Sequence, residues 1–134
     1  MSYTNLKIQE TSISEFRDYL ILKNNNIHWF YWHLNSNLKN FTTYKLFQKN
    51  NLVGVFCVEK NKSPMADLYI DEKYRRLGYG KFVIKYITTV FKNIQFKVNE
   101  RNYNSIKFFE FLLDEKIVLD KEQLKGEIIN YKFD

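Results

Sequence analysis

The feature that most constrains this chain is a central stretch that passes from a strand through a basic loop into a helix. Residues 65–70 alternate between two faces, as a strand does, and residues 82–91 carry apolar side chains at helical spacing. Two of the four glycines, Gly78 and Gly80, stand one residue apart where the helix must begin. Glycine allows a sharp turn or a close approach of the backbone to a ligand, so this junction is a candidate binding site.

The junction is suited to phosphate. The first turn of a helix leaves N–H groups unpaired, and its dipole favours negative charge. Arg75, Arg76 and Lys81 flank the turn and can add charge-assisted contacts to phosphate oxygens. A nucleotide P-loop is excluded because Phe82 follows the Gly-Lys pair, and a dinucleotide fingerprint is excluded because Val83 stands where a small residue is needed.

The composition predicts one globular domain, residues 1–134. A chain of 134 residues can bury about two thirds of its unfolded surface, and 45% hydrophobic residues exclude a disordered chain. The start lacks the apolar core of a signal peptide, and no apolar run approaches the ~20 residues of a membrane span. The single cysteine, Cys57, cannot form an intrachain disulfide. We therefore expect a cytoplasmic protein with no membrane contact.

The periodicity predicts the order β-α-α-β-β-β-α-β-α-β-β. Ser12 and Glu15 form a capping box at the start of the first helix, and Asn102 can cap the last. The strand–helix–strand unit around the glycines predicts two parallel neighbours with a right-handed crossover. The predicted strands are 4–9, 44–48, 52–59, 65–70, 94–99, 117–119 and 128–133, and the predicted helices are 12–23, 27–38, 82–91 and 102–113.

The loop resembles the acetyl-CoA loop of the GCN5-related N-acetyltransferase (GNAT) family, whose pattern Arg/Gln-x-x-Gly-x-Gly/Ala is met by residues 75–80. The family's second element, Asn-x-x-Ala-x-x-Phe-Tyr, is matched by Asn102, Ser105, Phe108 and Phe109, with Ser for Ala and Phe for Tyr. The order of elements is also similar, so the resemblance spans most of the chain. It implies an α/β fold with a central mixed sheet of six to seven strands flanked by four helices.

The resemblance also implies acetyl-CoA as the cofactor and CoA as the product. A backbone N–H between Leu68 and Ile70 would polarise the acyl carbonyl, and the loop would hold the diphosphate. Replacing Gly80 with Glu is then expected to abolish CoA binding without unfolding the protein. The implied cofactor-binding residues are Leu68, Tyr69, Ile70, Arg75, Arg76, Leu77, Gly78, Tyr79, Gly80, Lys81, Asn102 and Phe109. The implied catalytic residues are Leu68, Ile70, Phe109 and Tyr103.

Phe109 departs from the family, because in many members a tyrosine there protonates the departing CoA thiolate. A thiol has a reference pKa near 8.5, so its thiolate leaves tolerably without an acid, whereas an amine with a pKa of about 10.4 needs a base. Tyr103, Tyr74 or Tyr131 could replace the missing hydroxyl. Alternatively, Phe109 marks an acyl-CoA binder with little turnover.

Three carboxylates remain candidates for the general base: Asp67, Glu59 and Glu100. Each is also compatible with an ordinary surface position. In the family, the first two helices and their loop line the acceptor pocket, which makes Asp67 and the aromatic side of the second predicted helix candidates for substrate binding. The residues on that side are Trp29, Trp32 and His33, which are also compatible with an additional packing layer. No metal site is expected.

The sequence thus predicts an N-acetyltransferase that moves an acetyl group from acetyl-CoA directly to a primary amine of a small molecule or peptide. The first alternative is a catalytically weak acyl-CoA-binding or regulatory module. The second is a basic nucleic-acid-binding domain, suggested by the net charge of +6. The lysines are scattered, however, so we expect no nucleic-acid partner. A monomer and a homodimer both remain open.

Overall fold

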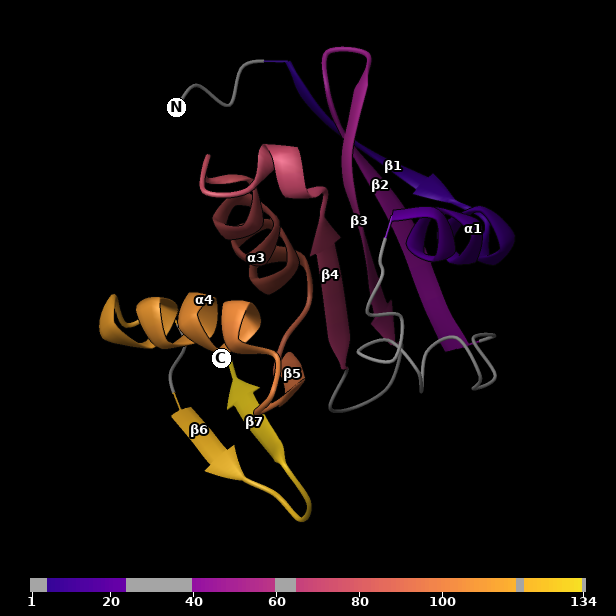
Figure 1. Cartoon of the computed structure of the whole chain (residues 1–134). Helices are drawn as coiled ribbons and strands as arrows, with labels where there is room; N and C mark the ends of the chain where they lie inside the picture. Colours follow the sequence, from indigo (N-terminus) through magenta and orange to yellow (C-terminus); the bar gives the residue numbers. More distant parts are fainter. Residues whose placement is uncertain (1–4, 24–39, 60–64, 118–119, 134) are drawn as a thin grey trace.

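A computed structural model describes residues 5–23, 40–59, 65–117 and 120–133 (Figure 1). The second predicted helix, 27–38, lies outside these residues. Within them, none of the helices is long and apolar enough to cross a membrane. The elements are β1 (Leu6–Thr11), α1 (Ile13–Lys23), β2 (Phe41–Gln48), β3 (Asn51–Glu59), β4 (Ala66–Ile70), a short 3-10 helix (Glu72–Tyr74), α3 (Tyr79–Val90), β5 (Gln95–Asn99), α4 (Tyr103–Asp114), β6 (Asp120–Gln123) and β7 (Ile128–Lys132).

The strands form two antiparallel sheets, with the orders β1-β2-β3-β4 and β5-β7-β6. The predicted α/β class is confirmed, but the mixed sheet is divided. In the described residues, β4 and β5 do not pair as neighbours along their lengths, and the predicted parallel pairing is limited to one bridge between Met65 and Gln95. The reason lies in the partners of each strand, because β4 pairs with β3 and β5 pairs with β7.

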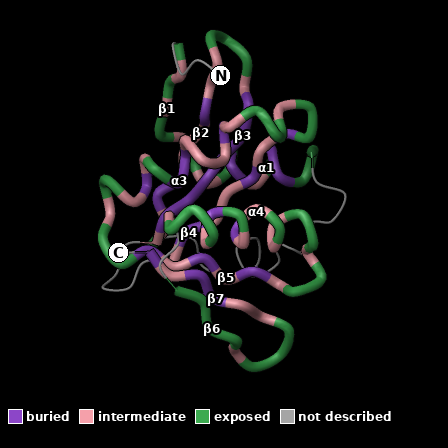
Figure 2. Tube along the Cα trace, turned by 90° about the vertical axis from the view of Figure 1, so that its left-hand side faces the viewer, coloured by how far each residue is buried: buried purple, intermediate pink, exposed green. Residues whose placement is uncertain are grey.

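Helices cover both faces of the four-stranded sheet. Figure 1 shows α1 on one side of this sheet and α3 on the other, while α4 lies beside the second sheet. The apolar stripe of α3, which includes Val83, Ile84 and Ile87, is fully buried in the larger core (Figure 2). A smaller core lies under α1, where Phe16 and Leu20 pack against β3 and β4. β4 therefore separates two cores and has a different environment on each face.

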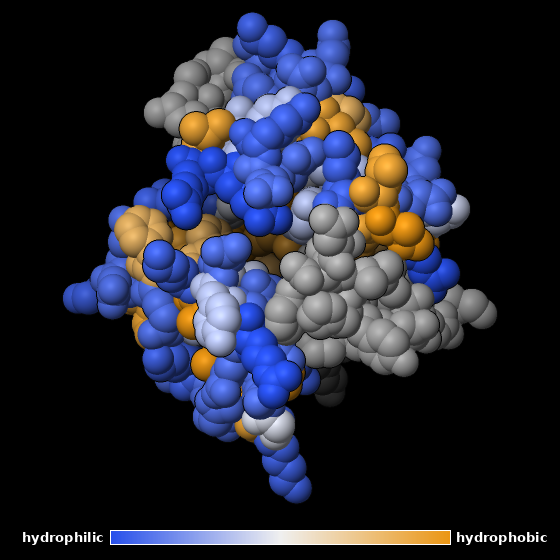
Figure 3. Space-filling view, viewed as in Figure 1, coloured by the Kyte–Doolittle hydropathy of each residue, from blue (hydrophilic) through white to orange (hydrophobic). Residues whose placement is uncertain are grey.

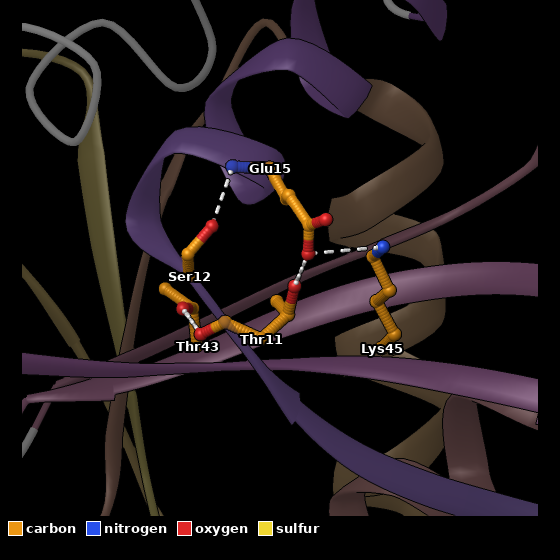
Figure 4. A network of polar contacts seen from close by, with 5 residues as sticks. All are labelled: Thr11, Ser12, Glu15, Thr43 and Lys45. Carbon is orange, nitrogen blue, oxygen red and sulfur yellow. Dashed lines mark hydrogen bonds and ion pairs between the residues drawn. The ribbon is translucent and has the colours of Figure 1, made fainter.

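A polar network fixes the start of α1 on the sheet (Figure 4). The Ser12 hydroxyl accepts a hydrogen bond from the Glu15 N–H at 3.1 Å, which confirms the predicted cap. The Glu15 carboxylate accepts from the Thr11 hydroxyl and pairs with Lys45 Nζ at 3.3 Å. These contacts, with the Thr11 hydrogen bond the largest, lower the pKa of Glu15. The network thus joins α1 to β1 and β2 at the point where the chain reverses.

Replacing Ser12 with Ala removes the side chain that caps α1 and should lower the free energy of unfolding by about 1 kcal/mol. Ser12→Gly should lower it by only a few tenths of a kcal/mol, because glycine is tolerated at this position. Urea unfolding of the three proteins measures both effects. Equal losses for the two variants would contradict a capping role for the Ser12 hydroxyl.

Candidate functional site

One edge of β4 presents backbone groups that β3 does not use. The Asp71 N–H donates to the Val53 carbonyl at 2.8 Å, directly after the end of β4. In an antiparallel pair, hydrogen-bonded and non-hydrogen-bonded positions alternate. The N–H and C=O groups of Leu68 and Ile70 therefore point away from β3, toward the side on which β5 lies. These are the groups that the sequence predicted for the thioester and the pantetheine arm.

β5 does not pair along this edge. The bridge between Met65 and Gln95 joins the two strands only where they begin. Beyond it, β4 runs up to the glycine turn before α3 (Figure 1), and β5 leads to Asn102 at the start of α4. The predicted cofactor elements therefore lie at the carboxyl ends of two parallel strands that are no longer bonded to each other.

Two of the outward-pointing backbone groups of β4 make hydrogen bonds to side chains of the protein. The Leu68 N–H donates to Asp67 Oδ1 at 2.8 Å. The Ile70 carbonyl accepts from Arg75 Nε at 2.9 Å. Neither contact was predicted from the sequence, because a side-chain contact to a nearby main-chain group leaves no periodic signal. Both lie at backbone groups that the resemblance assigns to the acyl and pantetheine parts of acetyl-CoA.

The glycine turn offers unpaired amides, as predicted. Gly78 has the left-handed conformation, with φ 91° and ψ 1°, and Arg76 also has a positive φ of 64°. The first helical hydrogen bond runs from the Phe82 N–H to the Gly78 carbonyl. In the described part of the chain, the N–H groups of residues 78–81 find no hydrogen-bond acceptor. Consecutive amides near a left-handed residue at a helix start form a concave anion-binding surface.

The three cations around the turn differ in what they contact. The Arg75 guanidinium lies over the Tyr69 ring, 5.2 Å from its centroid. Lys81 Nζ pairs with Glu115 Oε2 at 2.7 Å and so is directed toward the end of α4. Arg76 is exposed. Arg75 and Lys81 would have to leave these partners to bind a phosphate. Arg76 would not, as far as the described residues show.

Gly80 has a packing role as well as its position in the turn. A Cβ at this residue would stand 3.1 Å from Cζ of Phe108, so Gly80 allows α3 and α4 to approach closely. The Phe108 ring would have to shift by a few tenths of an ångström to accept a side chain here, and our expectation that Gly80→Glu leaves the fold intact stays a prediction. The neighbouring Tyr79 side chain is buried, and its hydroxyl lies 3.5 Å from Gln48 Oε1. The Tyr79 side chain is therefore not available to a ligand at the turn, whereas Leu77 is half exposed.

The two cofactor-binding residues predicted in the second family element, Asn102 and Phe109, have structural roles in α4 and the core. The Asn102 side chain accepts from the Ser105 N–H at 3.3 Å and caps α4, as predicted. The Phe109 side chain is 4% exposed and stacks on Tyr131, with ring centroids 5.0 Å apart. Phe109 therefore stabilises the core between α4 and the second sheet. Its contact with pantetheine stays a prediction.

The three tyrosines that could replace the missing hydroxyl lie in three different environments. Tyr131 is buried and donates to Glu110 Oε2 at 2.9 Å, and burial, followed by this contact, raises the pKa of Tyr131. Tyr103 is 75% exposed at the start of α4. Tyr74 packs edge-on against Tyr79. The Tyr131 hydroxyl is therefore bound to Glu110, and an acid role for Tyr103 or Tyr74 stays a prediction.

The α1 side of β4 is the candidate acceptor side. The Tyr69 hydroxyl donates to the carbonyl of Lys23, the last residue of α1, at 3.0 Å. Ile21 and Leu22 nearby are exposed, and apolar patches interrupt a mainly hydrophilic surface in Figure 3. The predicted substrate residue Asp67 shares the Tyr69 face of β4. The other predicted substrate residues lie outside the described residues: Trp29, Trp32 and His33.

Two of the three candidate bases lie on this face. Asp67 stands directly opposite Cys57 on β3, and Glu59 lies two residues further along β3 on the same face. Burial raises the pKa of the Cys57 thiol, which is therefore neutral and not a nucleophile. Glu100 is exposed in the turn after β5. Across the described ranges, no three His, Cys, Asp or Glu side chains gather as metal ligands do.

Comparison with known proteins identifies the family and supports the fold. The model of the acetyltransferase (GNAT) family matches residues 5–112. No curated protein of similar sequence was found. Among solved structures, an acetyltransferase from Thermus thermophilus superimposes with a TM-score of 0.72 at 11% identity, covering 98% of each chain.

Two further structures share the fold. A spermidine N-acetyltransferase SpeG chimera from Vibrio cholerae and hSSAT has a TM-score of 0.62 at 13% identity, covering 97% of this chain and 95% of its own. The ribosomal alpha-N-protein acetyltransferase RimL in complex with coenzyme A has a TM-score of 0.61 at 14% identity, covering 96% and 93%. The family match spans most of the chain. This chain belongs to the acetyltransferase (GNAT) family and is an N-acetyltransferase.

Proposed function

We propose that this enzyme transfers the acetyl group of acetyl-CoA directly to a primary amine of a small molecule or peptide. The observation that carries the proposal is the position of the glycine turn at the end of the open β4 edge. A ligand with a diphosphate at one end and an amide-containing arm can use the turn and the edge together. CoA has this construction.

The turn fits the diphosphate through its backbone. The amides of residues 78–81 supply donors, and the exposed Arg76 supplies charge. The edge of β4 fits the pantetheine arm, because the outward groups of Leu68 and Ile70 can pair with amides as a neighbouring strand would. Arg75 ties the turn to β4 through the Ile70 carbonyl, so its first role is to position the turn.

The acyl oxygen requires a donor where negative charge develops during attack by the amine. The Leu68 N–H has the right direction for this purpose, because it points out of the edge along which the arm would lie. Phe109 supplies no proton to the departing sulfur. A thiolate with a reference pKa near 8.5 leaves without one, so the chemistry depends mainly on removing a proton from the amine.

The acceptor is proposed from the neighbours in fold. Two similar structures carry the names of a spermidine N-acetyltransferase and a ribosomal alpha-N-protein acetyltransferase, so their named acceptors are a small molecule and a protein. For this chain we propose a small-molecule or peptide amine that enters from the α1 side of β4. We further propose a cytoplasmic monomer or homodimer without a nucleic-acid partner.

A second candidate is an acyl-CoA-binding module with little turnover. It is favoured by one observation, namely that the Asp67 carboxylate occupies the Leu68 N–H. The two candidates differ in a direct test with acetyl-CoA and a panel of amines containing spermidine, lysine and a short peptide with an unmodified N-terminus. Transfer to any member supports the enzyme, and stabilisation by acetyl-CoA with no transfer supports the module.

Replacing Arg76 with Asn tests the phosphate site, because Asn tolerates the left-handed backbone but carries no charge. We expect the Kd of CoA to rise about three- to tenfold, as the loss of an exposed charge-assisted contact predicts. The Kd of pantetheine, which lacks the diphosphate, should not change. Isothermal titration calorimetry measures both.

Lys125→Asn is the matched control, since Lys125 is an exposed cation in the turn between β6 and β7. It should leave both affinities unchanged. If CoA and pantetheine bind the wild-type protein equally well, or if both variants weaken CoA to the same extent, the turn does not hold the diphosphate.

Replacing Tyr131 with Phe tests whether a tyrosine substitutes for the missing acid. The ring stays stacked on Phe109, but the hydrogen bond to Glu110 is lost, so the free energy of unfolding should fall by about 1 kcal/mol. We expect kcat per folded molecule to stay unchanged, because the hydroxyl is buried and bound to Glu110 of α4. Tyr103→Phe should change neither quantity. A fall in kcat of about 100-fold in either variant would identify that tyrosine as the acid.

A further inference from the structure

A carboxylate lies on the backbone group that the proposed reaction needs. Asp67 Oδ1 accepts from the Leu68 N–H at 2.8 Å. The acyl oxygen of a bound thioester would have to stand at about the same distance from this N–H to be polarised by it. One N–H makes one strong, linear hydrogen bond. The Asp67 carboxylate and the acyl oxygen therefore compete for the same place.

The competition brings the carboxylate close to the reacting carbon. Asp67 precedes Leu68 in the chain, so a rotation of its short side chain releases the N–H without moving the carboxylate far. The acyl carbon is bonded to the oxygen that takes the vacated position. An amine attacking that carbon would have its nitrogen within the ~2.6–3.2 Å reach that proton transfer requires.

The two faces of β4 decide from which side the amine approaches. If the thioester lies along the open edge, the two faces of its carbonyl correspond to the two faces of the sheet. On one face the Leu68 side chain packs against the larger core under α3. On the other face lie Asp67 and Tyr69, and Tyr69 contacts the end of α1. The amine can therefore approach only on the Asp67 side.

The groups that surround Asp67 on this face leave it as the best-placed base. Cys57, directly opposite on β3, is buried and neutral. Glu59 lies on the same face but is diagonal to Asp67 and starts from a strand that does not border the open edge. Lys45 on β2, further across the same face, pairs with Glu15 of α1. Among the described carboxylates of this face, Asp67 alone is adjacent to Leu68 in the chain, and it accepts from the Leu68 N–H.

We propose that Asp67 is the general base of this enzyme and covers the acyl site until acetyl-CoA displaces it. This inference rests on the proposed function. The nitrogen of the amine forms a bond to the acyl carbon and gives a proton to the Asp67 carboxylate. The bond from that carbon to sulfur breaks, and the electron pair leaves on sulfur. Asp67 then passes its proton to water, and sulfur takes one from water, so the products are the amide and CoA.

Two substitutions separate the two roles. Asp67→Asn keeps an oxygen that can accept from the Leu68 N–H but removes the base. Its Kd for acetyl-CoA should lie between those of the wild type and Asp67→Ala, because a neutral amide accepts a weaker hydrogen bond than a carboxylate, and kcat should fall at least ~100-fold. Asp67→Ala removes both roles. It should lose kcat to the same extent but bind acetyl-CoA about two- to tenfold more tightly, because no hydrogen bond has to be displaced.

The measurements are acetyl-CoA titration by calorimetry and initial rates with the most active amine of the panel. Glu59→Gln is the matched control and should keep the wild-type Kd and kcat. Wild-type kcat in Asp67→Asn would overturn the assignment of the base. Should the wild-type protein acetylate no amine, the proposed transfer fails instead. In that case the Kd of Asp67→Ala still tests the competition, and a value equal to that of the wild type overturns it.

Discussion

The structure depends on the separation of β4 from β5 after a single bridge. A strand edge with unpaired N–H and C=O groups is costly when it is buried and hazardous when it is exposed, so proteins pair it or cover it. Here β3 pairs one edge of β4 throughout, and the opposite edge is left to Asp67 and Arg75. Beyond the bridge to β5, this edge of β4 has no neighbouring strand among the described residues. An extended ligand would fit there as the next strand.

The surrounding elements maintain this separation. Apolar residues of α3 and α4 fill one core that includes residues of both sheets, so the two sheets are held in place without being bonded along β4. Gly80 permits the close contact with Phe108 that joins the two helices. Gly78, two residues earlier, permits the left-handed turn that exposes the amides. Two glycines with different physical roles thus connect the packing of the helices to the binding site.

The local features of this site could be predicted from the sequence, but its long-range contacts could not. The helix start at Gly78 and the cap at Asn102 follow from residue types at fixed spacing. The division of the sheet does not, because the sequence of residues 94–99 has the same alternation whether β5 pairs with β4 or with β7. The ion pair of Lys81 with Glu115 joins residues far apart in the chain and has no local signal. The family resemblance predicted the roles of the site residues, whereas their contacts with distant parts of the chain are seen only in the three-dimensional structure.

The burial of Phe109 bears on which proton transfer the protein must assist. A hydroxyl at this position would have to leave the ring stack with Tyr131 or be satisfied within an apolar core, and a buried polar group without a partner is destabilising. Phenylalanine avoids that cost, and in the proposed reaction the sulfur would depart as a thiolate. The acceptor amine has a much higher pKa than the thiol, so proton removal is the more demanding step. The proposed base Asp67, whose carboxylate accepts from the Leu68 N–H, would serve this more demanding step.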